Sequence, residues 1–280
     1  MNEKEFTPAE MEVTDYTDPQ CPFCVDAYKK DNVKPIDAQR VIGHYRKGER
    51  KMKKIDRRIT YYAVLDTETA NTEVENMKFP MVYDLGFAIV DKRGTVYETF
   101  DFVIYEIYAR AKDLMRTAYY ADKLPQYETE LKDGTRKMVS ILTAYKTFRE
   151  VAKKYRIKAV IAHNAGFDLR ALNATIRYLT GSKIRYFFPF GLAVWDSQKM
   201  AHDTICKQKS YRAFCEEHGL MTNHKTPRVR ETAEALHRYR LLDNNYKERH
   251  TALSDVMIEK DIFARCMAQH KPMRKALFGE

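Results

Sequence analysis

Residues 61–68 read Tyr61-Tyr62-Ala63-Val64-Leu65-Asp66-Thr67-Glu68, a short apolar run that ends in two acids. The run predicts a buried strand. Side chains two positions apart in an extended segment point the same way, so Asp66 and Glu68 are expected to face one side at the strand's end. Two such carboxylates repel each other unless a cation lies between them, and oxygen ligands suit Mg²⁺ or Mn²⁺ rather than Zn²⁺. The pair alone is also typical of two exposed acids at a strand end.

The sequence after this run first suggests further strands and then an alternation of helices and strands. A turn at 91–94 (DKRG) separates two strand-like segments, and two more short apolar runs follow later in the chain. The predicted strands are 61–65, 84–90, 95–104, 158–162 and 192–195. The predicted helices are 108–121, 140–155, 168–180, 210–218, 230–239 and 251–269. Three strands followed by alternating helices and strands predict an α/β domain with a mixed sheet.

A second acidic motif, HNAGFD at 163–168, follows the predicted strand 158–162 and opens a helix. An acid near a helix N-terminus is favoured electrostatically, so Asp168 also has an ordinary structural interpretation. If the strand at 158–162 lies beside the first strand, however, Asp168 points towards the same site as Asp66 and Glu68. Asp196, which follows the strand 192–195, is instead expected to cap the next helix.

A third motif, HTALSD at 250–255, occurs near the start of the last predicted helix. Thr251 is a candidate cap for this helix, which would carry Asp255 in its first turn. His250 lies just ahead of the helix, where a lone histidine is usually a simple surface residue. Beside a metal-bound water it would be suited to act as a general base, because an unperturbed histidine has a pKa of about 6.5.

Together the three motifs resemble those of the DEDD superfamily of 3′→5′ exonucleases. The match covers about 58–265, and histidine five residues before the last acid is the pattern of the histidine (DEDDh, DnaQ-like) subclass. The segment 232–255 looks especially similar to small bacterial and phage-encoded members. The resemblance implies a ribonuclease-H-like fold, with a mixed central sheet flanked by helices, for residues 58–275. It places residues 1–57 outside the family's core, as an N-terminal extension.

The resemblance also implies the roles of individual residues. Asp66, Glu68, Asp168 and Asp255 would hold two Mg²⁺ or Mn²⁺ ions around the scissile phosphate, with His250 as the general base. The backbone of Thr69, together with Asn164 and Phe167, would contact the terminal nucleotide, although Phe167 is equally well explained as a core residue. The aromatic and basic residues Tyr119, Tyr120, Lys123 and Tyr127 suit single-strand stacking, but ordinary packing is the favoured interpretation.

The implied reaction releases nucleoside 5′-monophosphates from the 3′ end of a nucleic acid, with single-stranded DNA as the expected substrate. An RNA-specific exoribonuclease remains open, because the sequence does not separate deoxyribose from ribose. A nucleic-acid-binding replication accessory without catalysis is the alternative from another class, and the intact set of acids argues against it. Replication or repair proteins are the partners that such an activity would suggest.

Composition and charge agree with a nucleic-acid partner but do not establish one. The chain of 280 residues has 49 Lys and Arg against 39 Asp and Glu, a formal net charge of +10. Six of these net charges come from the run 46–58, which holds eight basic and two acidic residues. This run is either a solvated linker or a phosphate-binding segment. No apolar stretch approaches the ~20 residues of a membrane-spanning helix, and no signal-peptide pattern is present, so we expect a cytoplasmic protein.

The odd number of cysteines, five, does not suggest a disulfide scaffold. Cys21 and Cys24 form a CPFC motif in the extension. The favoured interpretation is two free thiols; the next is half of a Zn²⁺ site that needs two further ligands; and a redox pair comes last. Cys206, Cys215 and Cys266 are expected to be ordinary, partly buried residues.

Overall fold

The computed structural model describes residues 55–70, 80–118 and 120–277. Cys21, Cys24 and the basic run as far as Lys54 therefore lie outside the described residues, as does most of the predicted extension 1–57. The other three cysteines are free; Cys215 and Cys266 are buried and Cys206 is partly buried, as predicted. No helix in the described ranges is long and apolar enough to span a membrane.

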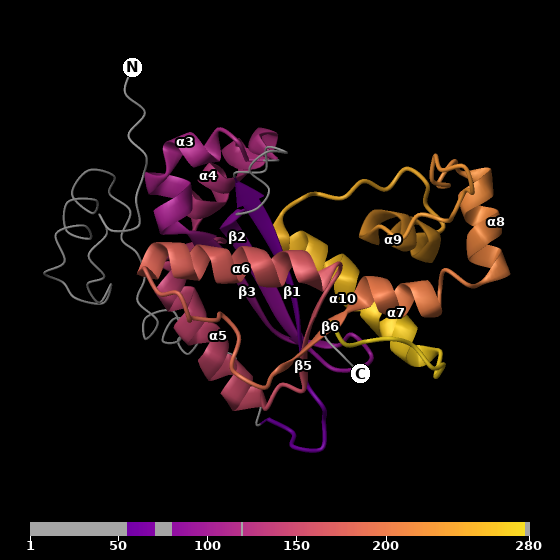
Figure 1. Ribbon diagram of the computed structural model, residues 1–280, viewed down its shortest axis with the longest axis horizontal. Helices are drawn as coiled ribbons and strands as arrows, with labels where there is room; N and C mark the ends of the chain where they lie inside the picture. The colour runs from indigo at the N-terminus through magenta and orange to yellow at the C-terminus, as the bar shows by residue number, and fades with distance from the viewer. Residues whose placement is uncertain (1–54, 71–79, 119, 278–280) are drawn as a thin grey trace, which may run out of the picture.

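A single mixed sheet forms the centre of the fold (Figure 1). Its strand order is β4-β3-β2-β1-β5-β6, with β2 antiparallel to both β1 and β3 and the other pairs parallel. The strands are β1 (Tyr62–Ala70), β2 (Met81–Val90), β3 (Val96–Ile104), β4 (Lys137–Val139), β5 (Ala159–Ala162) and β6 (Ala193–Asp196). This confirms the predicted α/β class and its ribonuclease-H-like arrangement.

Two details of the sheet differ from the sequence prediction. The first strand does not end at Leu65 but continues to Ala70, so Asp66 and Glu68 lie inside it and pair with β2. The register with β2 shifts between Glu68 and Thr69, which marks a bulge at the end of the acidic motif. The short edge strand β4 was not predicted, because three residues give too little periodicity to recognise.

The helices are the π-helical turn Glu106–Arg110, α3 (Lys112–Met115), the 3₁₀ turn Ala121–Lys123, α4 (Leu124–Asp133), α5 (Ile141–Tyr155), α6 (Ala165–Thr180), α7 (Ser197–Asp203), α8 (Lys209–Glu217), α9 (Ala233–Leu241) and α10 (Ala252–Ala268). The single helix predicted at 108–121 is wrong, since Ala111 leaves helical geometry and divides it into short pieces. Helix α4 was not predicted, although it has proline in its first turn and is followed by Gly134 in the left-handed conformation. The short helix α7 was not predicted either.

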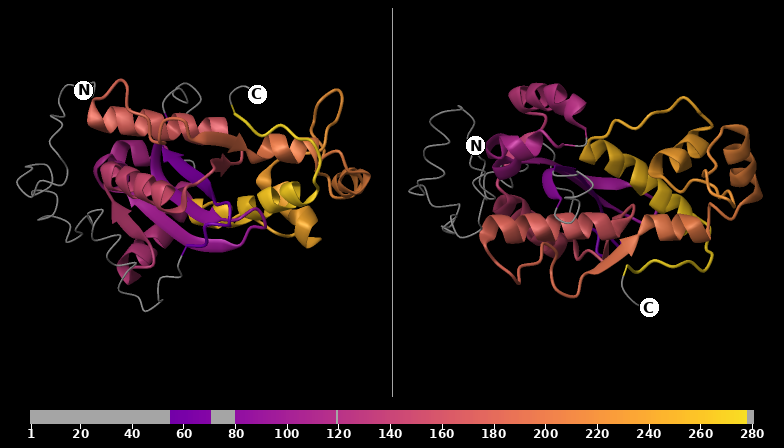
Figure 2. Two further views of the ribbon diagram at one scale, coloured as in Figure 1. Left: turned by 90° about the horizontal axis from the view of Figure 1, so that it is seen from below. Right: turned by 45° about the horizontal axis from the view of Figure 1, so that its top comes forward.

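Helices cover both faces of the sheet (Figure 2). Along β1, Ala63 and Leu65 belong to the apolar cluster under α5 and α6, whereas Tyr62 and Val64 belong to the cluster under α7–α10. The alternation of side chains along a strand continues this pattern, so Asp66 and Glu68 face α10. The first acidic motif is thus directed at the helix that carries the third.

The first turn of α10 packs closely against β2 at Gly86. A Cβ atom on Gly86 would lie 2.4 Å from the backbone nitrogen of Leu253 and 2.5 Å from the carbonyl carbon of Ala252. Only glycine permits this approach of helix backbone to strand backbone. Asp255, two residues further along α10, is thereby brought up to β1.

Candidate active site

The acids of the first and third motifs meet at one point. Asp66 and Glu68 on β1 and Asp255 on α10 each offer a carboxylate oxygen, and these atoms all lie within 4.8 Å of one another. Glu68 and Asp255 are buried, and Asp66 is partly buried. Asp255 lies in the first turn of α10, as predicted. Three carboxylates from two distant segments therefore form a compact acidic centre.

Asp168 joins this centre from the other face of β1. It lies in the first turn of α6, its side chain is buried, and its Oδ1 accepts a 2.7 Å hydrogen bond from the hydroxyl of Thr67. Thr67 stands between the two acids of β1, so this bond ties the start of α6 to the acidic motif. The negative charge of Asp168 raises the pKa of both Asp66 and Glu68, although burial is the larger cause in each case.

A fifth acid, Glu259, belongs to the same centre and was missed by the sequence analysis. It follows Asp255 by one helical turn on α10 and is only 3% exposed. After burial itself, the charge of Glu259 is the largest cause of the raised pKa of Asp66. The available sequence signal was an acid four residues after Asp255 on the same predicted helix, a spacing that places both on one face.

These five carboxylates lack a positive partner. Among the described residues, none of them forms an ion pair, and Asp255 Oδ1 and Glu259 Oε2 are buried without any hydrogen-bond partner. Burial, followed by repulsion from neighbouring acids, raises the pKa of Asp66, Glu68, Asp255 and Glu259; for Glu68 and Asp255 the largest such effects come from the charges of Asp84 and Glu248, respectively. A divalent cation would relieve both effects, and a ligand set made only of carboxylate oxygens suits Mg²⁺ or Mn²⁺. The residues present therefore fit the predicted metals.

Asp84 shows how the same fold treats a structural acid. It is fully buried and pairs with Glu68 across β1 and β2, yet it has three partners. Arg136 Nη1 lies 2.6 Å from it, the hydroxyl of Tyr127 donates at 2.6 Å, and the backbone N–H of Ala252 donates at 3.0 Å. Asp84 is thus neutralised by Arg136 and holds the first residue of α10 in place.

This arrangement corrects one prediction about the third motif. Thr251 occupies the N-cap position of α10, but its side chain makes no capping bond to the helix backbone. Its hydroxyl instead bonds that of Ser254 at 2.7 Å. The N–H of Ala252 is satisfied by Asp84, so a residue 168 positions away in sequence replaces the local cap.

His250 lies just ahead of α10 with a left-handed backbone, at φ 54°. Its ring is stacked on that of Tyr120, with 4.0 Å between centroids and 7° between planes. The ring is partly buried, and desolvation lowers the pKa of His250 below its ordinary value. The imidazole is therefore uncharged near neutral pH, the form that accepts a proton.

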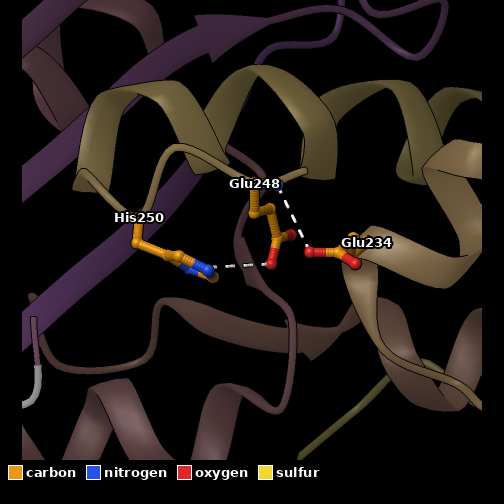
Figure 3. A group of neighbouring side chains, drawn as sticks. All are labelled: Glu234, Glu248 and His250. Atoms are coloured by element: carbon orange, nitrogen blue, oxygen red, sulfur yellow. Dashed lines mark hydrogen bonds and ion pairs between the residues drawn. The ribbon is translucent and has the colours of Figure 1, made fainter. Parts of the chain in front are cut away.

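Two glutamates lie beside the histidine (Figure 3). Nδ1 of His250 is 3.9 Å from a carboxylate oxygen of Glu248, and the backbone N–H of Glu248 donates to Glu234 at 3.3 Å. Burial, and next the charge of Glu234, raises the pKa of Glu248 to about 7. Glu234 is paired with Arg238, so unlike the acidic centre this group contains its own cation.

The remaining predicted site residues lie at the ends of β1 and β5. Thr69 is buried at the bulge of β1, and Phe167 is partly exposed in the first turn of α6. Asn164 is exposed, adopts a left-handed backbone, and its N–H donates to Asp196 at 3.1 Å. Asp196 also accepts from the N–H of Gln198 and so caps α7, which confirms its structural role.

The aromatic residues predicted for strand stacking, Tyr120 and Tyr127, lie in different environments. Tyr127 is fully buried against Arg136 and Asp84, which confirms the packing interpretation for this residue. Tyr120 contacts the catalytic candidate His250 through its ring face. Tyr119 lies outside the described residues.

No protein-family model matches this chain, and no curated protein matches it. Several solved structures resemble it at low identity, among them the following three. Exonuclease X in complex with 5′-overhanging duplex DNA is 17% identical over 75% of this chain and 92% of its own, with a TM-score of 0.35. A 3′-exonuclease in a structure of histone mRNA stem-loop recognition is 13% identical over 85% and 74%, with a TM-score of 0.46. Pop2p of S. pombe, with Mg²⁺ and Mn²⁺ bound, is 12% identical over 76% and 84%, with a TM-score of 0.42.

Proposed function

We propose that this chain is a metal-dependent 3′→5′ exonuclease of the DEDD superfamily, acting on single-stranded DNA. One observation carries the proposal: three carboxylates, of Asp66, Glu68 and Asp255, converge with no cation among them, the buried acids Asp168 and Glu259 lie beside them, and His250 precedes the last helix. A centre of this kind is costly for the fold alone, because buried charges without partners are strongly disfavoured. Its acids are therefore best explained as ligands.

In the proposed mechanism, Asp66, Glu68, Asp168 and Asp255 hold two Mg²⁺ or Mn²⁺ ions. When bound, such ions activate a water and stabilise charge on a phosphodiester and its leaving oxygen. The acids supply four negative charges that offset the four positive charges of the ions, so that a phosphate can enter. Thr67 orients Asp168 through its hydroxyl. The hydrogen bond from the N–H of Ala252 to Asp84 fixes the position of α10 relative to β2, and hence the position of Asp255.

His250 takes the proton from the attacking water in this scheme. The water oxygen forms a bond to phosphorus, the bond to the 3′ oxygen of the preceding nucleotide breaks, and a nucleoside 5′-monophosphate leaves. Stacking on Tyr120 limits the rotation of the imidazole, and the lowered pKa keeps it unprotonated before the reaction. A general base typically contributes on the order of 10²–10⁴ in rate.

Thr69, Asn164 and Phe167 contact the terminal nucleotide in this proposal. All three border the acidic motifs, and the partly exposed ring of Phe167 is available to a base or a sugar. The exposed Asn164 side chain offers hydrogen-bond groups at the same edge of the sheet.

The test is digestion of oligonucleotides labelled at the 3′ or the 5′ end. With Mg²⁺ or Mn²⁺ we expect the 3′ label to appear first as a mononucleotide, and EDTA to stop the reaction. Asp66→Ala should lower kcat by at least ~10³, because it removes a metal ligand. Asp113→Ala, which changes an acid that is 93% exposed, serves as the matched control and should keep activity.

Several results would contradict the proposal. If the protein degrades no oligonucleotide with either metal, the alternative of a nucleic-acid-binding protein without catalysis is favoured. If Asp66→Ala keeps full activity, the acidic centre does not take part in the reaction. Parallel digestion of DNA and RNA of equal length decides the sugar preference. Faster cleavage of RNA would show that RNA, not DNA, is the preferred substrate, and the proposed mechanism would stay the same.

A further inference from the structure

The loop that joins α6 to β6 exposes large apolar side chains on a firmly held backbone. Ile184 is 84% exposed, Tyr186 61% and Phe190 fully exposed. Between them, Phe187 and Phe188 are buried in the core against α5. The loop is therefore anchored from within, and exposed apolar groups gathered in this way mark a binding surface.

The same loop is basic. Residues 181–192 contain Lys183 and Arg185 and no acid. The guanidinium of Arg177, at the end of α6, lies 4.4 Å from the centroid of the Tyr186 ring, and its Nε donates to the carbonyl of Arg185 at 2.9 Å. The exposed ring of Tyr186 thus stands beside positive charge, which suits a ligand that combines flat aromatic groups with negative charge.

A groove beside the loop extends this surface towards α5. Its lining includes Phe190 and Leu192 of the loop, Arg149 and Lys153 of α5, and Ile157. Glu150 is the single acid in the lining, against two basic residues. The groove therefore keeps the positive balance of the loop and adds apolar lining residues.

The outer face of α6 connects this loop with the acidic centre. Phe167, Arg170, Ala174 and Arg177 recur at intervals of three and four residues, so they share one side of the helix. Arg170 is exposed and the other three are partly exposed, whereas the opposite side of α6 is buried. Ten residues of helix separate Phe167 from Arg177, a length of about 15 Å. In Figure 2, α6 runs along the outside of the molecule without another helix covering it.

We infer that this surface, made of Arg170 and Arg177 on α6 with Lys183, Tyr186 and Phe190 in the loop, binds the single-stranded nucleic acid upstream of the 3′ end. The inference rests on the proposed function. Phosphates lie against the arginines and Lys183, and bases stack on Tyr186 and Phe190. Exposed rings interleaved with cations favour a nucleic-acid strand over a protein partner, since stacking and phosphate contacts tolerate any base sequence.

The test compares cleavage of a strand of about twelve nucleotides, which is long enough to reach the loop, with cleavage of a dinucleotide, which is too short to reach it. For Tyr186→Ala and Phe190→Ala in the full chain, the ratio of kcat/KM for the long strand to that for the dinucleotide should fall about five-fold or more per ring. Arg170→Ala should reduce the slope of log affinity against log salt for the long strand by about 0.7. Leu242→Ala, which changes an exposed apolar side chain at the end of α9, and Lys225→Ala are the matched controls.

Equilibrium binding with Asp66→Asn separates this inference from the proposed function. If the wild type cleaves nothing but Tyr186→Ala and Phe190→Ala weaken binding of the long strand, the surface stands and the exonuclease proposal fails. If the wild type is active and both variants keep the wild-type ratio and affinity, the inference is overturned. A concentration-dependent dimer that is lost in Phe190→Ala, measured by light scattering, with unchanged strand affinity, would assign the surface to a second copy of the chain instead.

Discussion

At the scale of single residues, the fate of each buried acid depends on its nearest partner. Asp84 and Asp255 are both buried beside Glu68, but Asp84 has Arg136 whereas Asp255 has an oxygen without any partner. The first acid is therefore structural, and the second is available to a ligand. Sequence type alone does not separate the two, since both are aspartates in apolar surroundings.

Glu259 is the residue whose role the structure adds. Glu259→Gln removes one negative charge from the acidic centre at nearly constant volume. In metal-free protein near pH 7.5, we expect the free energy of unfolding to rise by about 1 kcal/mol or more, because the folded state no longer has to accommodate this acid beside the other buried acids. The midpoint for Mg²⁺ stabilisation should move to higher concentration, since the centre attracts cations less strongly.

Thermal unfolding across an Mg²⁺ titration measures both effects. Glu217→Gln, an exposed acid on α8, is the control and should change neither. An unaltered metal response in Glu259→Gln, together with unaltered metal-free stability, would show that Glu259 does not share the electrostatics of the centre.

At the scale of secondary structure elements, the position of α10 is the critical variable. The helix brings Asp255 to β1, and two contacts with β2 fix its first turn: the approach at Gly86 and the bond from Ala252 to Asp84. Asp84 is in turn held by Arg136, which also pairs with Asp101 on β3 and Glu130 on α4. Arg136 and Glu130, which lie between β3 and β4, thus hold Asp84 in place and through it support the position of α10.

Gly86→Ala tests this dependence. The added methyl would overlap the backbone of Ala252 and Leu253, which cannot move aside cheaply, so we expect a loss of about 1–3 kcal/mol in stability. Catalysis should fall further than the folded fraction does, because Asp255 moves with the helix. Chemical denaturation and kcat of the folded protein are the measurements.

Gly166→Ala offers a matched comparison on α6. Its added methyl would meet only the side chain of Leu277, at an ordinary 3.6 Å, and the position is helical. Stability should therefore stay constant or rise by about 0.5–1 kcal/mol. A loss in Gly86→Ala no greater than that in Gly166→Ala would contradict the packing explanation.

At the scale of the whole molecule, the pH dependence of stability should respond to metal. The acids of the centre have pKa values raised by burial and repulsion, so they favour the folded state below their unfolded pKa of about 4 and lose that contribution as pH rises. Metal-free protein should therefore become less stable between about pH 5 and pH 8. Saturating Mg²⁺ should remove most of this loss, since it binds the ionised form.

Glu106 provides an internal control for the pH experiment. It accepts the N–H of Ile141 at the start of α5, and burial raises its pKa to about 7. Its contribution falls over the same pH range but does not depend on metal, so Glu106→Gln should reduce the loss of stability by the same amount with and without Mg²⁺. An equal pH dependence with and without Mg²⁺ in the wild type would argue against a cation in the acidic centre.

The sequence by itself determined the α/β class, most strands and the later helices, because apolar periodicity and turn residues are local properties. It also indicated the three acidic motifs, since each lies where a strand or a helix boundary can be recognised. It could not give the length of β1, whose acidic end is extended only because β2 pairs with it. The short elements β4 and α7 and the broken helix after β3 also depend on neighbours rather than on local pattern.

Only the tertiary structure decided which acids meet and which are neutralised. Asp66, Glu68 and Asp255 come together because α10 packs on the face of β1 to which the alternation directs the two strand acids. Glu259 joins them because it lies one helical turn after Asp255. Asp84 is not available as a ligand, because it is paired with Arg136, 52 residues away in the sequence. Charge interactions in a buried site depend on distance in space and on desolvation, and neither quantity is written in the order of the residues.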